Sequence, residues 1–356
     1  TLWVKLIQNR VETGEPYIMF KDTVDAALPK YQQDLGLEVH HSNLCSEITL
    51  PTDENRTAVC CLSSVNLEEY DEWKNDDLFI PDLIRMLDNV LDHFIHNAPP
   101  ELHRAVYSAR QERSLGLGAM GFHAYLQRHS IPFESVIAKI RNKQMFHEIK
   151  EKANEATKFL AKERGECPDA VGHGVRNSHL LAIAPNASSS IICGNTSPSI
   201  EPYRANAFVQ KTKTGSSLLK NEYLEHCLDE IGMNNEDIWQ SIITHDGSVQ
   251  HLEFLDDETK DIFKTGPELD QRWLVEFAAD RQEYICQSQS LNLFFPADVS
   301  KQELHAVHMM AWKKGVKTLY YLRSEAIKRE DRVSDEALRQ YMFDSISDDS
   351  CLACEG

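Results

Sequence analysis

The fold class is clearest between Trp273 and Leu322, where the sequence reads WLVEFAADRQEYICQSQSLNLFFPADVSKQELHAVHMMAWKKGVKTLYYL. Apolar residues recur at helical spacing from Trp273 to Tyr284 and from Lys301 to Trp312, which predicts two helices. Apolar runs follow them, from Ser290 to Phe294 and from Val316 to Leu322, and predict two strands. Strands that alternate with helices indicate an α/β fold, either layered or a barrel.

The same alternation extends toward the N-terminus, without an internal repeat or a low-complexity segment. Only the acidic C-terminal stretch, roughly Asp344 to Gly356, is predicted to be disordered. The further predicted elements are an amphipathic helix from Leu2 that stops at Gly14, a short buried strand from Pro16 to Phe20, a helix from Ile80 to Ile95, one or two helices from Phe133 to Leu160 and a strand from Leu180 to Ala184.

The composition is that of a globular protein, since 42% of the 356 residues are hydrophobic and 26% are charged. The 56 acidic residues outnumber the 37 basic ones, and the net charge of −19 opposes non-specific attraction to nucleic acid or anionic membranes. The sequence holds no run of about 18 apolar residues and no signal-peptide pattern after Thr1. We therefore expect a cytoplasmic protein whose nine cysteines are thiols rather than a disulfide scaffold.

Chemically capable side chains gather in the heptapeptide SNLCSEI. In an extended segment alternate residues share a face, so Asn43, Cys45 and Glu47 would present an amide, a thiol and a carboxylate together. A half-exposed edge strand with a polar face is the alternative. On a second predicted strand, Cys60 and Cys61 must point to opposite sides, so only one of them can share a cavity with Cys45. Two packed thiols without a redox role remain possible there.

The remaining cysteines suggest one further redox pair. Cys351 and Cys354 form a Cys-x-x-Cys motif in the acidic C-terminal stretch, but no second pair accompanies them to complete a zinc site. We interpret them as a mobile dithiol that carries reducing equivalents by thiol–disulfide exchange, with an incidental pair as the alternative. Cys167, Cys227 and Cys286 are expected to be buried small hydrophobic residues.

Two loop motifs raise the question of nucleotide binding. Gly116, Gly118 and Gly121 match G-x-G-x-x-G, but no convincing strand precedes them and no acidic residue follows at the required distance. We expect close backbone packing at a strand-to-helix corner instead. Small hydroxyl residues from Pro185 to Ser190 follow an apolar strand and could cradle a phosphate if a helix begins there, or could form a simple turn.

Aromatic and histidine pairs complete the set. Tyr320 and Tyr321 end the last predicted strand, where adjacent tyrosines commonly fill a core or an interface and face opposite ways. Two histidine pairs at helical spacing have no third metal ligand nearby, so we expect surface histidines and no metal site. These are His93 with His96 and His305 with His308.

Taken in order, these motifs resemble the large catalytic subunit of class I aerobic ribonucleotide reductases. The motifs are SNLCSEI, AVCCLSSVNL, the Pro185–Ser190 loop with Ile200-Glu201-Pro202, KTLYY and the C-terminal Cys-x-x-Cys. The resemblance covers essentially the whole chain and looks closest to the bacteriophage branch. It implies a ten-stranded α/β barrel of two half-barrels with a central finger loop, of which this chain is the C-terminal portion, completed by another chain. Residues 1–343 would form that part of the barrel, with the finger loop at about 40–50, and residues 344–356 a flexible redox-active tail.

The resemblance also implies roles for the finger-loop residues. Cys45 would become the thiyl radical that abstracts the 3′ hydrogen of a ribonucleoside diphosphate. Glu47 would be the general base on the 3′ hydroxyl, and Asn43 would hydrogen-bond the substrate there. Cys60 would be one of two cysteines that reduce the 2′ position, leaving Cys61 as its outward neighbour.

Further roles follow from the same resemblance. Tyr320 and Tyr321 would relay the radical to the thiol, which requires a departure from strand alternation, and Cys351 with Cys354 would re-reduce the active site. The substrate diphosphate would lie against Asn186, Ala187, Ser188, Ser189 and Ser190.

The implied partners supply what this chain lacks. No cofactor is expected on it, because a small subunit with a metal-tyrosyl cofactor would generate the radical. Thioredoxin or glutaredoxin would reduce the tail dithiol, and nucleotide effectors would bind the N-terminal part of the large subunit. The compartment would be the cytoplasm, or that of the host if a phage encodes the chain.

One element of the family pattern has no match here. The second active-site cysteine lies well upstream of the finger loop in the family, whereas this sequence begins 44 residues before Cys45. Either the chain is an excised fragment or the subunit is split, and we favour a split because Thr1 could follow a removed initiator Met; an N-terminal companion chain would then complete the site. A non-catalytic partner chain that binds the small subunit is the alternative function, ahead of a nicotinamide dehydrogenase based on Gly116, Gly118 and Gly121.

Overall fold

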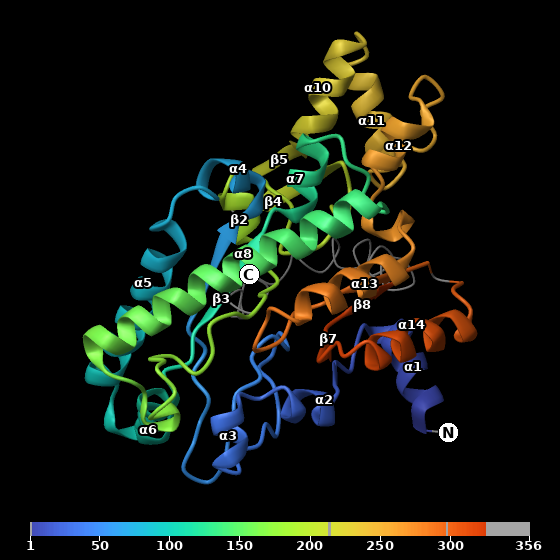
Figure 1. The fold of residues 1–356 in the computed structure, drawn as a ribbon. Coiled ribbons are helices and arrows are strands. Elements are labelled where there is room, and N and C mark those ends of the chain that lie inside the picture. The colour runs from blue at the N-terminus through green and yellow to red at the C-terminus, as the bar shows by residue number, and fades with distance from the viewer. Residues whose placement is uncertain (1, 213–214, 297, 325–356) are drawn as a thin grey trace.

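Parallel strands form the frame of the molecule, which a computed structural model describes for residues 2–212, 215–296 and 298–324 (Figure 1). Strand β2 pairs in parallel with β3, and β6 with β8, whereas β1 runs antiparallel to β7. Parallel bridges from Leu117 to Leu181 and from Ile183 to Gln289 link the two parallel pairs. The strands are β1 (Ile18–Met19), β2 (Leu62–Asn66), β3 (Gly116–Met120), β4 (Ala207–Thr212), β5 (Gly215–Lys220), β6 (Leu293–Phe295), β7 (Thr318–Leu319) and β8 (Leu322–Ser324).

Helices connect the parallel strands, as a crossover between parallel neighbours requires. Figure 1 shows the long helix α8 running across the β2–β3 pair, and α5 packs against it. The α-helices are α1 (Leu2–Thr13), α2 (Lys21–Ala26), α3 (Lys30–Asp34), α4 (Tyr70–Trp73), α5 (Phe79–Asn97), α6 (His103–Glu112), α7 (Phe122–Arg128), α8 (Val136–Arg164), α9 (Ser189–Ile192), α10 (Glu222–Glu230), α11 (Glu236–Thr244), α12 (Asp257–Ile262), α13 (Gln271–Gln282) and α14 (Lys301–Lys313).

The main core lies between these helices and the strands. Apolar side chains of α5 repeat every three or four positions, and Ile80, Ile84, Leu87 and Leu91 are all buried in it. Helix α8 is started by Ser135, whose hydroxyl accepts the Ala138 N–H at 3.1 Å. A smaller, separate core joins the β4–β5 hairpin to helices α10, α11 and α12, which Figure 1 shows together at one end of the molecule.

The predicted helices are confirmed. Helices α1, α5, α13 and α14 match the predicted bounds within two or three residues. The stretch from Phe133 to Leu160 forms one helix, α8, which begins at Val136 and continues to Arg164. None of the helices in the described residues is long and apolar enough to cross a membrane.

The predicted strands are confirmed less well. Residues 180–184 are extended but make only isolated bridges, and the strand predicted from Ser290 lies at Leu293–Phe295. The strand predicted from Val316 to Leu322 is interrupted, because Tyr320 and Tyr321 separate β7 from β8. The predicted buried strand near Pro16 is only the two half-buried residues of β1. The predicted tail, residues 344–356 with Cys351 and Cys354, lies outside the described residues.

The motif of Gly116, Gly118 and Gly121 allows close backbone packing, as expected. Its first residues belong to strand β3 rather than to a loop after a strand. A Cβ on Gly118 would lie 2.5 Å from the Ala182 carbonyl oxygen of the neighbouring segment. Gly121, at φ +80°, makes the turn from β3 into α7. The three glycines therefore allow close approach of backbones and form no dinucleotide-binding turn.

Two predictions of residue environment are wrong. His308 is fully buried rather than on the surface, although His93, His96 and His305 are exposed as predicted. Cys167 is buried as predicted, but Cys227 and Cys286 are only half-buried. The Cys286 sulfur also receives two backbone N–H groups, so it is not a simple hydrophobic residue.

Candidate functional site

The heptapeptide around Cys45 forms a tight turn, so the predicted extended segment is wrong. Ser46 has φ +70°, and its N–H donates to the Asn43 carbonyl at 3.1 Å. The Asn43 amide oxygen accepts the Ile48 N–H at 3.0 Å, which leaves the Asn43 NH₂ to hydrogen-bond Glu47. The turn brings the amide and the carboxylate together, as the pattern suggested, but by a different backbone path.

The segment before β6 anchors this turn. The Ser288 N–H donates to the Glu47 carbonyl at 2.9 Å, and the Gln287 side chain accepts the Thr49 N–H at 3.3 Å. The Ser290 hydroxyl lies between the Cys45 carbonyl and the Glu47 carboxylate, 3.0 Å from the latter. The loop is therefore fixed to the parallel strands at the position of the thiol and the acid.

Cys45 contacts a cluster of tyrosines. The Tyr320 hydroxyl lies 3.6 Å from the Cys45 sulfur, and the ring centroids of Tyr320 and Tyr321 are 4.5 Å apart. Tyr17 completes the cluster at 4.7 Å from the first ring and 4.9 Å from the second. The predicted departure from strand alternation is confirmed, because the two adjacent tyrosines contact one another between β7 and β8. No pattern in the sequence pointed to Tyr17, which the pairing of Ile18 with Leu319 places opposite Tyr320.

A buried arginine holds the backbone of this cluster. Arg10 of α1 donates to the Tyr320 carbonyl at 3.0 Å and to the Pro16 carbonyl, and also to Nε2 of His308 at 3.2 Å. His308 of α14 donates from Nδ1 to the Leu304 carbonyl, so Nε2 carries the lone pair. Burial, and then the charge of Arg10, lower the pKa of His308 to about 4. This arginine–histidine pair positions the tyrosines, and the sequence pattern did not reveal it.

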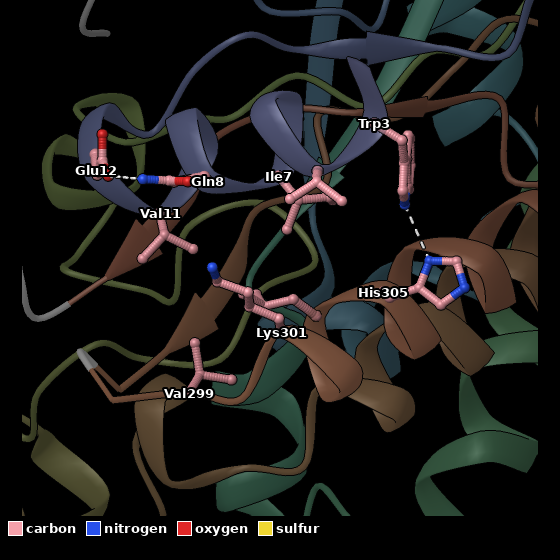
Figure 2. A pocket seen from close by; sticks show the side chains of 10 residues that line it. Trp3, Ile7, Gln8, Val11, Glu12, Val299, Lys301 and His305 are labelled. Atoms are coloured by element: carbon pink, nitrogen blue, oxygen red, sulfur yellow. Dashed lines mark hydrogen bonds between the residues drawn. The ribbon is translucent and has the colours of Figure 1, made fainter. Parts of the chain in front are cut away.

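The same two helices, α1 and α14, enclose an apolar cleft of about 500 Å³ (Figure 2). Trp3, Ile7 and Val11 line it from α1, and Val299 and Leu304 line it from the opposite side. Figure 2 shows Trp3 and His305 closing one end, where the indole N–H donates to the imidazole at 2.9 Å.

Cys60 opens onto a pocket of about 450 Å³ that Asn43 also lines. Cys61 points the opposite way into the core, with its sulfur 3.5 Å from the Leu87 carbonyl. Of the two cysteines, Cys60 lines this pocket and Cys61 is a buried core residue; a cavity shared with Cys45 stays a prediction. Desolvation, and then the negative charge of Glu47, raise the pKa of the Cys60 thiol to about 12.

Glu47 itself is almost fully buried, with 2% of its surface exposed. Burial raises the pKa of its carboxyl, although hydrogen bonds from Asn43 and Ser290 act in the opposite direction. A buried carboxyl with a raised pKa beside a thiol can accept a proton from a bound hydroxyl group.

The hydroxyl-rich loop lies next to the strand that follows Cys60. The Asn186 amide oxygen accepts the Ser64 hydroxyl at 3.2 Å, and its NH₂ donates to the Ser189 hydroxyl at 3.1 Å. A short helix, α9, does begin at Ser189. Ser190 is buried and donates to the Ala187 carbonyl, whereas Ser188 is exposed. Of the predicted phosphate-binding residues, those up to Ser189 are therefore accessible to a ligand.

Glu201 and Asn292 support the outer tyrosine. Asn292 donates its N–H toward Glu201 at 3.4 Å and accepts the Tyr321 N–H at 3.2 Å. The Arg323 guanidinium lies 4.0 Å from the centre of the Tyr321 ring.

Across the described residues, no group of three or more His, Cys, Asp or Glu side chains is arranged to hold a metal ion.

Comparison with known proteins places this geometry in a family. The family model for the ribonucleotide reductase barrel domain matches residues 1–172 and 168–322. The chain is 50% identical to the ribonucleoside-diphosphate reductase large subunit of Invertebrate iridescent virus 3 and 48% identical to a putative large subunit of Frog virus 3, in each case over its whole length. Both relatives are viral, which agrees with the viral character expected from the sequence.

A solved structure shows the same fold. The class Id ribonucleotide reductase alpha subunit of Actinobacillus ureae matches 92% of this chain with a TM-score of 0.86 and 42% sequence identity. The chain spans 56% and 62% of the two viral relatives and 62% of that alpha subunit. The predicted fold class, the C-terminal part of a ribonucleotide reductase α/β barrel, is confirmed.

Proposed function

Because this chain belongs to the ribonucleotide reductase barrel-domain family, we propose that it carries the catalytic site of a ribonucleoside-diphosphate reductase large subunit. The reaction would convert ribonucleoside diphosphates to deoxyribonucleoside diphosphates by radical chemistry. The contact between the Tyr320 hydroxyl and the Cys45 sulfur carries the proposal, because it joins a one-electron carrier to a thiol.

The proposed first step is a hydrogen-atom transfer. A Tyr320 phenoxyl radical takes the hydrogen atom of the Cys45 thiol, which forms the phenol and leaves the thiyl radical. The ring contact with Tyr321, 4.5 Å between centroids, supports the outer tyrosine as the preceding carrier. A radical-generating small subunit would deliver the oxidising equivalent to Tyr321.

The substrate would occupy the pocket between the finger loop and Cys60. Its ribose would lie beside Asn43 and Glu47, where the buried carboxylate can take the 3′ hydroxyl proton once Cys45 has removed the 3′ hydrogen. The diphosphate would lie against the loop from Asn186 to Ser190, whose side-chain and backbone donors suit negative charge.

Reduction of the 2′ position takes two thiols, and the geometry supports only Cys60 as one of them, since Cys61 faces the core. We infer that the second thiol comes from the remainder of the large subunit, either a companion chain or a further part of this one. Cys351 and Cys354 would restore the Cys60 pair by disulfide exchange and would themselves be reduced by thioredoxin or glutaredoxin. The proposed compartment is the cytoplasm.

The test compares two neighbouring thiols. In an assembly of this chain with the remainder of the large subunit and the small subunit, Cys60→Ala should abolish multi-turnover reduction of a ribonucleoside diphosphate. Cys61→Ala, which alters the residue facing the core, should retain it. Sustained turnover by Cys60→Ala would contradict the proposed role, and equal loss in both variants would indicate a structural effect.

A further inference from the structure

A second polar thiol site lies outside the substrate pocket. Cys286, in the connection that follows α13, accepts the N–H groups of Leu180 at 3.0 Å and Leu181 at 3.2 Å. The opposite arrangement, with the thiol as donor to the Leu181 carbonyl, is longer at 3.6 Å. Neutral sulfur is a weak acceptor, so two short amide contacts suit the thiolate.

A buried histidine faces this sulfur. The His179 ring lowers the pKa of the Cys286 thiol, and its buried Nδ1 has no hydrogen-bond partner of normal geometry within the described residues. Its Nε2 lies 2.9 Å from the Gln32 amide oxygen, which can only accept. The hydrogen must then be on Nε2, which leaves Nδ1 with its lone pair and without a hydrogen-bond partner within the described residues, so that it is able to accept a proton. Cysteine, histidine and glutamine thus form a nucleophile, a base and a group that orients the base.

The surrounding charges favour the same ionisation. Burial alone would raise the pKa of Cys286, but the charge of Lys150, the His179 ring once it has taken the thiol proton and become a cation, and the hydrogen bond from Leu180 outweigh it and hold that pKa well below its usual value. Lys317, which donates to the Cys286 and Gln287 carbonyls at 2.6 and 2.7 Å, is a further cation nearby, with its own pKa lowered to about 8 by burial. The phenol of Tyr31 also lies within electrostatic range of the thiol and has a raised pKa, so it is neutral at physiological pH.

We propose that Cys286 is a nucleophilic thiolate activated by His179 and is a site of oxidation by small hydroperoxides. The sulfur attacks one peroxide oxygen, an S–O bond forms as the O–O bond breaks, and the sulfur loses two electrons to become a sulfenic acid. The leaving oxygen takes the proton that His179 received from the thiol and departs as water or an alcohol. The two amide N–H groups that hold the thiolate can also hold the sulfenate anion.

The position of the thiol gives such a modification a short path to the substrate pocket. Cys286 precedes Gln287, Ser288 and Ser290, the residues that fix the finger loop. The proposal for Cys286 does not depend on the proposed reductase function, because it concerns only the reactivity of this thiol.

The test uses the unmodified protein and its other thiols as internal controls. The chain is treated with limiting hydrogen peroxide at pH 6.5 in the presence of dimedone, and the labelled cysteines are quantified by mass spectrometry. Cys286 should be labelled at least about tenfold faster than Cys193, which is more exposed. Labelling of Cys286 at or below the rate of Cys193 would overturn the proposal.

Two variants separate activation from exposure. His179→Gln removes the base and should reduce Cys286 labelling at least about tenfold at pH 6.5, while leaving Cys193 unchanged. Lys150→Met removes the charge that lowers the pKa of Cys286 most and should also reduce the labelling of Cys286. An unchanged rate in a folded His179→Gln protein would contradict activation by the histidine; if that variant does not fold, the comparison of Cys286 with Cys193 in the unmodified chain still decides.

Discussion

Cys60 in the substrate pocket and Cys286 outside it show how one residue type acquires two chemistries. Cys60 faces the pocket near the Glu47 carboxylate, and its pKa is raised to about 12. Cys286 faces a histidine, two amide N–H groups and a lysine, and its pKa is lowered. Hydrogen transfer needs an intact S–H bond, whereas nucleophilic attack needs the anion. The neighbouring charges, rather than exposure, therefore separate the two sites.

The Glu47→Gln variant should produce the largest difference between the thiols of Cys60 and Cys286. The variant removes the proposed base and should lower turnover about 10²–10⁴-fold. It also removes the negative charge beside Cys60, so the pKa of that thiol should fall and its alkylation by iodoacetamide should begin at lower pH. Cys286 should alkylate as before, because Glu47 is not among the groups that shift its pKa. An unchanged pH profile for Cys60 would show that burial alone raises its pKa and that the Glu47 carboxylate contributes nothing.

The two buried histidines differ as well: Nδ1 of His179 has no hydrogen-bond partner within the described residues, whereas Nε2 of His308 accepts a hydrogen bond from Arg10. Because the folded pKa of His308 is about 4 and an unfolded histidine titrates near 6.5, the unfolded chain binds more protons between these values. The free energy of unfolding should therefore fall as the pH drops from about 6.5 to 4, by about 3 kcal/mol for this group.

His308→Gln isolates that contribution. The variant should lose stability at neutral pH but show a weaker decline toward pH 4, measured by urea unfolding. His93→Gln, on the exposed face of α5, is the matched control and should keep the full decline. The same pH dependence in His308→Gln and the parent protein would mean that His308 is not kept neutral by its burial.

The smallest effect concerns how the two regions bind anions, by backbone N–H groups at Cys286 and by hydroxyl groups at the diphosphate loop. Replacing Ser188 and Ser189 with Ala should weaken binding of a ribonucleoside diphosphate by about 1–2 kcal/mol per lost hydrogen bond, measured by calorimetry. Binding of the corresponding nucleoside should not change. Equal losses for the nucleoside and the diphosphate would place the phosphates elsewhere.

Local patterns predicted the parts of this molecule that local forces determine. The helical repeat of α5 and the opposite directions of Cys60 and Cys61 follow from backbone geometry alone. The finger loop did not, because its turn depends on Ser46 at φ +70°, a conformation that serine seldom adopts and that anchoring by the segment before β6 stabilises here.

Long-range partners account for the other errors. His308 has the spacing of a surface residue, but Arg10, its hydrogen-bond partner, lies 298 positions away in the sequence. Cys286 is likewise defined by His179 and by the backbone of the segment 180–181, and Tyr17 by the β1–β7 register. Such polar pairs leave no periodic signal in the sequence, because each polar side chain can be buried only where its distant partner satisfies it.

Tyr320→Phe isolates the contact proposed to carry the radical, because it removes the hydroxyl that contacts Cys45 and keeps the ring in its cluster. Reduction of a ribonucleoside diphosphate by the complete assembly should be abolished, while substrate affinity and the unfolding temperature remain near those of the parent. Tyr17→Phe is the matched control from the same cluster and should lose far less activity, since its hydroxyl lies against Tyr321 rather than Cys45. Appreciable turnover by Tyr320→Phe would contradict the transfer of a hydrogen atom between Tyr320 and Cys45.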